Sequence, residues 1–342
     1  MGILNSFTTD MGIDMGTTTT LVVLKDSGIV LKEPTLVAVE QAKEEIIAVG
    51  EEARQMVGRT PKQIQVLCPL RNGVIADYTL GRVLLHKVLK KVLEHRSLTR
   101  PRIILTVPYG VTSVERRAVI DAALEAGAKE AYLIDTPLAA ALGAGIPIQD
   151  VTTALVMDLG GGTTEAAVIS QGRIVYGRTL RLGGRELDEA LVQYVKKKYN
   201  LLIGAQEAEQ AKIEIGTVQE THPAAKMQIR GKDLLTGLPK SLFLDQNQVR
   251  EAILPSVHQI VEWLRTFLEQ MPETMASSVL ESGMVLTGGG ALLRNLDLLL
   301  AKETGLKVLT AENAAACAAL GTGKAARNMK WFRMGRKSRG TR

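Results

Sequence analysis

The chain alternates short apolar runs with turns rich in glycine and threonine, and one such arrangement occurs twice. Near the start, Gly12-Ile-Asp14-Met-Gly-Thr-Thr-Thr-Thr20 leads into an apolar run, and near the middle Leu155-Val-Met-Asp158-Leu-Gly-Gly-Gly-Thr-Thr164 does the same. Both segments read as strand, tight turn, strand. Each aspartate lies 14 residues before a glycine, Gly28 or Gly172, that opens another β-branched run. The sequence therefore predicts two equivalent three-stranded meanders.

The two predicted halves also end alike. The Ala-rich segments 137–145 and 315–323 both close on glycines, as helices commonly do. They are candidates for a hinge between the halves, and tight helix packing explains them equally well. Each half thus reads β-β-β, insertion, β-α-β-α, which predicts α/β sheets covered by helices. The later strands and helices are expected at 103–107, 112–126 and 131–134 in the first half, and at 284–286, 291–303 and 307–309 in the second.

The insertions differ in size. Residues 33–68 are expected to form a small subdomain, and residues 183–255 a larger one with helices near 185–198 and 206–216. The predicted organisation is therefore a first half at 1–145, a second half at 146–323 and a basic tail at 324–342, with four subdomains around a central cleft.

The two glycine-rich turns have the composition of phosphate-binding loops. Glycine lets backbone N–H groups approach a phosphate closely, and threonine hydroxyl groups add donors. An aspartate beside such a loop would repel phosphate unless a cation intervenes, so Asp14 and Asp158 indicate one Mg²⁺ held through waters. Two plain β-hairpin turns are the alternative, although three successive glycines carry an entropic cost. A third cluster, Thr287-Gly-Gly-Gly-Ala-Leu292, follows a strand and opens a helix.

Together with the two Ala-rich helices, these loops resemble the actin, heat-shock chaperone and sugar-kinase superfamily. More narrowly, the chain is similar to the MreB family of bacterial actin-like proteins over about 10–325. The resemblance implies a duplicated actin-like (ribonuclease H-like) fold that binds ATP and Mg²⁺. It rests further on the segments Gly73–Asp77, Arg100–Ile103, Gly204–Gly216, Leu235–Pro239 and Val285–Arg294.

The resemblance assigns positions to the nucleotide. The first loop, including Asp14 and Gly16, should lie against the phosphates, and the second should hold them from the other side. The third cluster should line the adenosine pocket. Glu209 and Lys212, on one turn of a helix, should contact ribose and base. Without the resemblance, these two residues read as an exposed ion pair. The residues are Thr17, Thr18 and Thr19; Gly160, Gly161, Gly162 and Thr163; Gly288, Gly289, Gly290, Ala291 and Leu292; and Glu209 and Lys212, with Gln210 and Ala211 between them.

Hydrolysis requires a positioned water and neutralisation of charge on the phosphates. Asp158 is the first candidate for the metal and water network, and Thr163 for positioning the γ-phosphate or the water. The family usually carries a Glu where this chain has Thr136, beside Asp135, and tends to carry Asn where it has Thr19. A hydroxyl group cannot act as a carboxylate base. The expectation is slower or differently gated ATP hydrolysis with nucleotide binding intact.

Charge is concentrated in the tail. The formal net charge is +6, but eight of the 42 basic residues and no acidic residue lie at 324–342, which leaves 34 basic against 36 acidic residues. A near-neutral body argues against a nucleic-acid groove. Cys68 and Cys317 are too few for a disulfide framework and suit a reducing cytoplasm. No apolar run is long enough to span a membrane.

The tail is a candidate membrane anchor. Ala325, Met329 and Phe332 follow helical spacing beside Trp331, among basic residues that suit an anionic surface. A solubilising tail is the alternative, and Ile3, Leu4 and Phe7 offer a second short apolar segment.

The resemblance implies filaments of the protein itself on the inner face of the cytoplasmic membrane, integral-membrane partners of cell elongation, and a role in cell-wall synthesis and rod shape. A non-hydrolysing scaffold, a chaperone-like ATPase and a sugar kinase are the competing interpretations.

Overall fold

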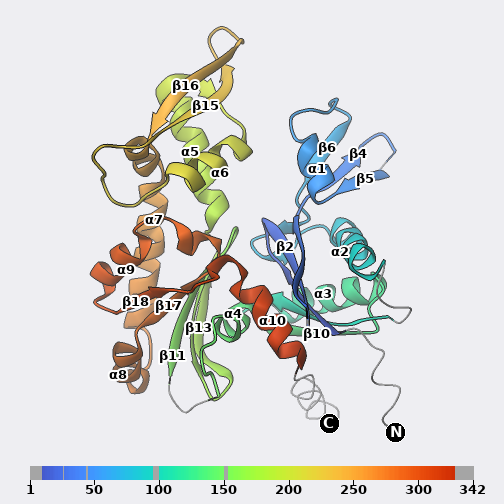
Figure 1. Ribbon diagram of the computed structural model, residues 1–342, viewed down its shortest axis with the longest axis vertical. Helices are drawn as coiled ribbons and strands as arrows, with labels where there is room; N and C mark the ends of the chain where they lie inside the picture. The colour runs from blue at the N-terminus through green and yellow to red at the C-terminus, as the bar shows by residue number, and fades with distance from the viewer. Residues whose placement is uncertain (1–9, 26, 44, 95–99, 150–152, 328–342) are drawn as a thin grey trace. The chain divides into compact units, whose positions relative to one another are not determined.

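The computed structural model describes residues 10–25, 27–43, 45–94, 100–149 and 153–327. Ile3, Leu4 and Phe7, and the tail positions from 328 onward, lie outside the described residues. The chain divides into two compact units (Figure 1). Unit 1 comprises residues 1–149 and 316–342, and unit 2 comprises residues 150–315.

The described part of unit 1 is built on a five-stranded sheet in the order β10-β9-β1-β2-β3. The first three strands form the predicted meander, and β1 pairs in parallel with β9. Helices α2 (Tyr78–Leu93) and α3 (Ser113–Glu125) contribute to the core that covers this sheet, with Leu84, Leu85 and Ile103 fully buried. The strands are β1 (Asp10–Met15), β2 (Thr19–Leu24), β3 (Gly28–Pro34), β9 (Arg102–Val107) and β10 (Glu130–Asp135).

The described part of unit 2 repeats this plan. Its five-stranded sheet has the order β13-β12-β11-β17-β18, so β11 corresponds to β1 and β17 to β9. The β11–β17 pair is parallel, like its counterpart. The strands are β11 (Ala154–Leu159), β12 (Thr164–Ser170), β13 (Arg173–Leu180), β17 (Met284–Thr287) and β18 (Val308–Thr310). The predicted order β-β-β, insertion, β-α-β-α is present in both halves of the sequence.

The insertion of unit 1 is a small three-stranded sheet in the order β5-β4-β6, followed by a two-stranded hairpin. Its elements and the helices of this unit are β4 (Val37–Glu40), β5 (Glu45–Val49), α1 (Glu51–Met56), β6 (Ile64–Leu67), β7 (Leu70–Arg71), β8 (Val74–Ile75), α2 (Tyr78–Leu93), α3 (Ser113–Glu125), α4 (Thr136–Gly143) and α10 (Cys317–Arg327).

The insertion of unit 2 contains two of the predicted helices and a β-hairpin that extends away from the five-stranded sheet of its unit (Figure 1). One expected helix, at 291–303, is instead a 3-10 turn followed by a shorter α-helix. The elements are α5 (Gly184–Tyr199), β14 (Leu201–Leu202), α6 (Ala205–Ile215), β15 (Lys226–Asp233), β16 (Pro239–Asp245), α7 (Gln246–Glu269), α8 (Glu273–Ser282), η2 (Gly289–Leu292) and α9 (Leu296–Thr304), with η3 (Ala314–Ala316) at the unit boundary.

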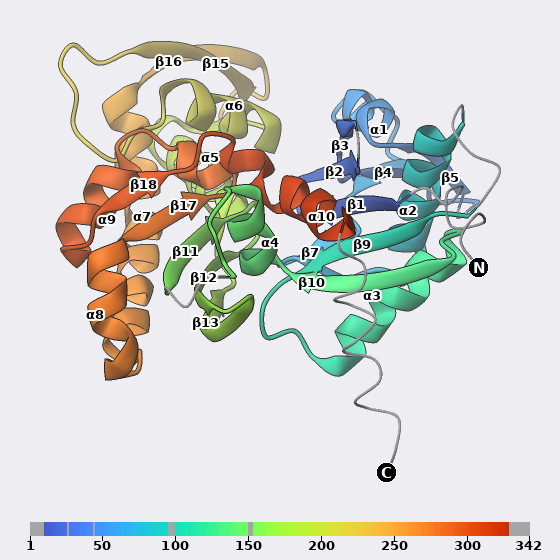
Figure 2. The same ribbon diagram turned by 60° about the horizontal axis from the view of Figure 1, so that its bottom comes forward.

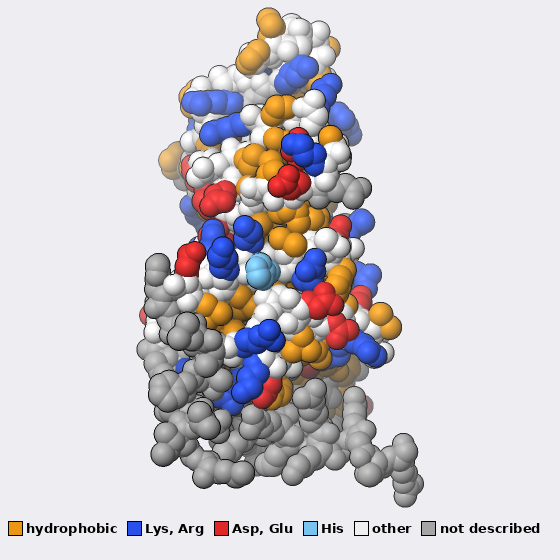
Figure 3. Space-filling model, turned by 90° about the vertical axis from the view of Figure 1, so that its right-hand side faces the viewer, with side chains coloured by type: hydrophobic (Ala, Val, Ile, Leu, Met, Phe, Trp, Pro, Cys, Tyr) orange, Lys and Arg blue, Asp and Glu red, His pale blue; other side chains and the backbone are white. Residues whose placement is uncertain are grey.

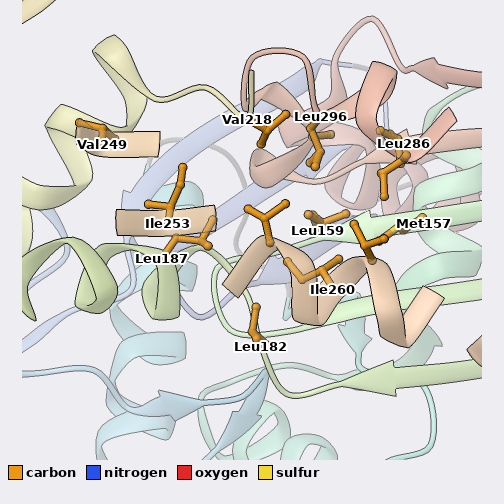
Figure 4. Close-up of a cluster of buried hydrophobic side chains, with 14 of the residues drawn as sticks. Met157, Leu159, Leu182, Leu187, Val218, Val249, Ile253, Ile260, Leu286 and Leu296 are labelled. Carbon is orange, nitrogen blue, oxygen red and sulfur yellow. The ribbon is translucent and has the colours of Figure 1, made fainter. Parts of the chain in front are cut away.

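Helix α7 forms the centre of the core of unit 2. It begins inside the expected insertion and continues well beyond residue 255. Its buried side chains recur at helical spacing and pack with β11 and β17 in one cluster, which includes Ile253, Ile260, Met157 and Leu286 (Figure 4).

The two Ala-rich helices pack directly on each other within unit 1. Helices α4 and α10 make an extensive contact, and they lie side by side in both views (Figures 1 and 2). A methyl group on Gly321 would overlap the backbone oxygen of Ala139, and one on Gly143 would overlap that of Cys317. Glycine is required by this close approach. The sequence-based boundary at residue 323 counted α10 with the second half, whereas its contacts are with the sheet and α4 of unit 1.

Candidate nucleotide-binding loops

Each of the two predicted loops is a tight turn between antiparallel strands. In the first loop (residues 14–19), Gly16 N donates to Thr19 O at 3.1 Å. In the second loop (residues 158–164), Gly160 N donates to Thr163 O at 2.8 Å. The backbones are therefore β-hairpin turns, as the alternative interpretation had it. What distinguishes them from ordinary turns is the aspartate that precedes each one.

Both aspartates accept a hydrogen bond from a threonine on the neighbouring parallel strand. Thr106 Oγ1 donates to Asp14 Oδ1 at 2.6 Å, and Thr287 Oγ1 donates to Asp158 Oδ1 at 2.8 Å. Burial raises the pKa of the Asp14 carboxyl above its usual range, and the bond from Thr106 lowers it by a smaller amount. The two carboxylates thus share the same threonine contact in the two units.

Carboxylate oxygens are suitable donors for Mg²⁺, which usually retains several waters and needs few protein ligands. No group of three or more His, Cys, Asp or Glu side chains that could hold a metal ion occurs among the residues that the structure describes. Taken singly, the carboxylate of Asp14 or of Asp158 is a donor that suits a magnesium ion which keeps most of its waters.

The first loop is held in place by its own unit. Thr17 is 4% exposed, and its hydroxyl group accepts from Gly73 N at 3.0 Å. Thr35 donates from its hydroxyl group to Gly16 O at 2.7 Å and from its backbone to Thr18 O at 2.9 Å. These bonds fix the loop backbone against the small insertion and the β7–β8 hairpin. Thr18 and Thr19 are half-buried.

The second loop rests on the start of helix α5. Gly184 N donates to Gly160 O at 3.0 Å, and Arg185 N donates to Gly161 O at 2.9 Å. A methyl group on Gly183 would lie 2.6 Å from Gly160 O, so the close approach requires glycine there. The first N–H groups of α5 therefore bind carbonyl groups of the loop and hold its backbone in position.

A buried carboxylate that the sequence analysis missed lies behind Thr163. Glu165 is 1% exposed and accepts from Thr163 Oγ1 at 3.3 Å. It is the direct cross-strand partner of Asp158, whereas the corresponding partner of Asp14 is Leu21. Cross-strand partners share one face of a sheet. The signal in the sequence was an acidic residue at the start of an otherwise apolar strand.

The predicted pair on α6 has a different partner in the structure. Lys212 Nζ lies 2.7 Å from Asp188 Oδ1 and donates to Gly184 O at 2.8 Å, because α6 packs against α5. Burial raises the pKa of Asp188 to about 6, although Lys212 acts to lower it. Glu209 is half-buried on the same helix. The simple Glu209–Lys212 ion pair that the sequence suggested as an alternative is therefore wrong.

The residues between that pair point in different directions. Gln210 is exposed and donates to Glu214 at 2.8 Å, whereas Ala211 is fully buried in the core of unit 2.

The third cluster divides into packing and open positions. Gly288 has a positive φ of 83°, and a methyl group there would overlap Leu159 O. A methyl group on Gly290 would lie 2.8 Å from Leu159 Cβ. A methyl group on Gly289 would meet nothing within 4 Å. Packing therefore explains Gly288 and Gly290, and Gly289 is the glycine of this cluster that faces open space. Ala291 is buried, and Leu292 is 61% exposed.

At the start of α4, both polar side chains are engaged. Thr136 Oγ1 donates to Val107 O at 3.1 Å, and Asp135 pairs with Arg116. Thr136 thus satisfies the carbonyl group at the end of β9, and Asp135 is directed to α3.

One face of the molecule shows basic, acidic and hydrophobic side chains interspersed rather than gathered by charge (Figure 3). None of the helices in the described ranges is long and apolar enough to cross a bilayer.

The chain matches the family described as MreB/Mbl protein over residues 8–334. It is 44% identical over 324 residues to the cell shape-determining protein MreB of Escherichia coli (strain K12), with 93% of each chain covered. MreB5 of Spiroplasma citri, solved bound to AMPPNP, has a TM-score of 0.90 at 32% identity, with 96% of this chain and 98% of that chain covered. The MamK double helical filament shares the fold, with a TM-score of 0.78, 20% identity, and 93% and 98% covered.

Proposed function

Because the chain belongs to the MreB/Mbl family of actin-like proteins, we propose that it is an ATP-dependent cytoskeletal protein that assembles into filaments of its own copies. The actin-like fold and the family predicted from the sequence are both confirmed. The relatives that match over nearly the whole chain include cell shape-determining proteins and a protein crystallised with AMPPNP and with ADP.

The observation that carries the proposal is the matched pair of loops. Each has a turn closed by a glycine N–H group and an aspartate held by a threonine on the adjacent strand. A hairpin turn by itself does not require a carboxylate held in this way beside it. We propose that both loops bind the phosphates of one ATP, with Asp14 and Asp158 holding Mg²⁺ through waters.

When bound, Mg²⁺ would neutralise charge on the transferred phosphate. The residues of the chain would do the positioning. Thr17, Thr18 and Thr19 and the second loop would hold the phosphates, and Gly289 would leave room for the adenosine. The hydroxyl group of Thr163, fixed by its bond to Glu165, would orient the attacking water.

Filament formation is proposed from the family and the fold. The MamK neighbour is a double helical filament at low identity, which supports the fold alone. We further propose that filaments lie on the inner face of the cytoplasmic membrane, contact integral-membrane proteins of cell elongation and organise cell-wall synthesis. The basic amphipathic tail supports the membrane part of this proposal.

A non-hydrolysing scaffold of the same fold is the second candidate. The observation in its favour is Thr136, whose hydroxyl group donates to Val107 O at the position where the family resemblance implies a carboxylate. Such a protein would still bind ATP and assemble, but it would not release phosphate.

Assembly in the presence of ATP, ADP and AMPPNP separates these functions. Light scattering and electron microscopy should show filaments with ATP and AMPPNP and fewer with ADP, and phosphate release should follow assembly with ATP. Filaments without phosphate release would favour the scaffold. Absence of filaments with every nucleotide would contradict the cytoskeletal proposal.

A further inference from the structure

The two threonines that contact the aspartates occupy equivalent positions in the duplicated sheets. In unit 2, Asp158 and Thr287 are direct register partners on β11 and β17. In unit 1, the β1–β9 register ends with Ile13 opposite Leu105, so the next residues along are Asp14 and Thr106. Adjacent parallel strands place such partners on one face of the sheet. The same Thr–Asp contact is thus built twice by the same pair of strands.

Both contacts have the length of a good hydrogen bond from a hydroxyl donor to an oxygen acceptor. The distances are 2.6 Å to Asp14 and 2.8 Å to Asp158. Thr287 Oγ1 also lies 3.4 Å from Met157 O, and the shorter bond is the one to the carboxylate. Each hydroxyl group therefore has the aspartate as its principal acceptor.

Burial and side-chain stiffness make these bonds directional. Thr106 is 8% exposed and Thr287 is fully buried, so bulk water has little access to replace either hydroxyl group. Threonine is branched at Cβ, and its χ1 angle is restricted. A threonine fixed in a strand can therefore hold one carboxylate oxygen and restrict the orientation of the whole carboxylate.

The surroundings of the two aspartates have diverged, whereas this contact has not. Asp158 faces Glu165 across the antiparallel pair, and Asp14 faces Leu21. The Thr–Asp contact is common to both environments, which sets it apart from general packing of the loops.

We propose that Thr106 and Thr287 are a duplicated pair of positioning residues, each of which orients one of the two carboxylates toward magnesium-bound ATP. This inference rests on the proposed function, because it assumes that Asp14 and Asp158 hold the metal. Hydrogen-bonded partners of direct metal ligands tune metal affinity by about 10–100-fold, and the threonines, which act through carboxylates that hold the metal by way of its waters, belong at the lower end of that range. The threonines should therefore act on the Mg²⁺-dependent part of ATP affinity and leave the rest unchanged.

The test measures ATP affinity of the full chain by titration calorimetry, once with Mg²⁺ and once with EDTA. The ratio of the two dissociation constants reports the contribution of the metal. Thr106→Val and Thr287→Val keep the shape of the side chain and remove the donor. Each should reduce the ratio by about tenfold, the lower end of the range for such partners, while affinity in EDTA stays at the wild-type value. Thr106→Ser and Thr287→Ser keep the hydroxyl group and should retain the wild-type ratio.

Thr322→Val is the matched control, because Thr322 is also fully buried but donates to a helix carbonyl group, Ala319 O, at 2.6 Å. It should leave the ratio unchanged. Thr106→Ala and Thr287→Ala provide a second pair without the donor, should a valine variant not fold. Three results would overturn this inference and leave the proposed function standing. They are an unchanged ratio in the variants without the donor, a reduced ratio for the threonine of only one unit, and an equal loss of ATP affinity in EDTA. A wild-type chain with no Mg²⁺-dependent affinity would overturn the proposed function as well.

Discussion

The side chain of Thr136 is engaged in a way that a glutamate could not reproduce. Its hydroxyl group donates to Val107 O, whereas a carboxylate has no proton to donate at neutral pH. A glutamate at this position would release that carbonyl group and extend beyond it. Thr136 therefore anchors the start of α4, but it offers no carboxylate that could accept a proton from water.

We expect Thr136→Glu to speed phosphate release in single-turnover measurements with ATP by roughly a hundredfold, the lower end of what a positioned general base contributes. Thr136→Val is the control, since it removes the hydroxyl group without adding a carboxylate, and it should show no acceleration. An unchanged rate in Thr136→Glu would count against slow hydrolysis caused by Thr136.

Asp188 makes the stability of unit 2 depend on pH. Burial raises its pKa to about 6 from 3.8, with Lys212 and Arg185 favouring the charged form and Glu209 opposing it. The folded state therefore holds the proton more tightly than the unfolded state. The resulting stabilisation is complete below pH about 4 and is lost as pH rises through about 6.

Asn cannot titrate, so Asp188→Asn should remove this pH dependence. Relative to the variant, the wild type should lose up to about 3 kcal/mol of unfolding free energy between pH 4 and pH 7. Denaturation series of both chains at several pH values provide the measurement. Parallel pH profiles for the two chains would contradict the assignment to Asp188.

At the scale of helices and strands, the contact between α4 and α10 depends on glycine. Gly321 approaches the backbone of Ala139, which cannot move aside as a flexible side chain could. Alanine is ordinarily the better residue inside a helix by about 1 kcal/mol. Here the clash should outweigh that gain.

Gly321→Ala should therefore lower the unfolding free energy by about 1–3 kcal/mol, as overpacking of a close contact does. Gly204→Ala serves as the control, because a methyl group on Gly204 would meet nothing within 4 Å. It should cost less than about 1 kcal/mol. Equal thermal stability of the Gly321→Ala variant and the wild type would show that the helices can separate without cost.

The elements that follow from local pattern were predictable, and those set by tertiary contacts were not. The two meanders are marked by the glycine and threonine turns and by equal spacing to Gly28 and Gly172. By contrast, no local signal indicates that Lys212 pairs with Asp188, since the two lie on different helices. The placement of α10 in unit 1 depends likewise on a glycine contact with α4, far away in sequence.

The candidate site shows the same division. Asp14 and Asp158 were identified from the repeat itself, whereas Thr106 was missed because it lies 92 residues from its partner. Glu165 was overlooked because it directly follows the second loop, at the start of an otherwise apolar strand. A search for polar residues at matching positions of the two repeats would have found both threonines.

At the scale of the whole molecule, the basic tail is the segment that we propose binds an anionic membrane surface. Helix α10 is packed through Ala326, which is 1% exposed, and Arg327 donates to Lys25 O. A deletion should therefore begin at residue 328, so that this packing is preserved. Six of the eight basic tail residues lie beyond that point.

Deletion of 328–342 should reduce sedimentation with anionic liposomes at low salt, because each basic residue near such a surface contributes about 1 kcal/mol. High salt should weaken the binding of the full chain in the same way. ATP binding of the deleted chain is the control for folding. Unchanged liposome binding after the deletion would remove the tail from the proposal.

The most direct test of the account is whether one magnesium-bearing ATP requires both loops. ATP affinity should be measured with and without Mg²⁺ for the wild type, Asp14→Asn and Asp158→Asn. We expect the wild type to bind ATP at least about tenfold more tightly with Mg²⁺, and each variant to lose that difference. A wild type whose ATP affinity is independent of Mg²⁺, or variants that retain the full difference, would contradict the account.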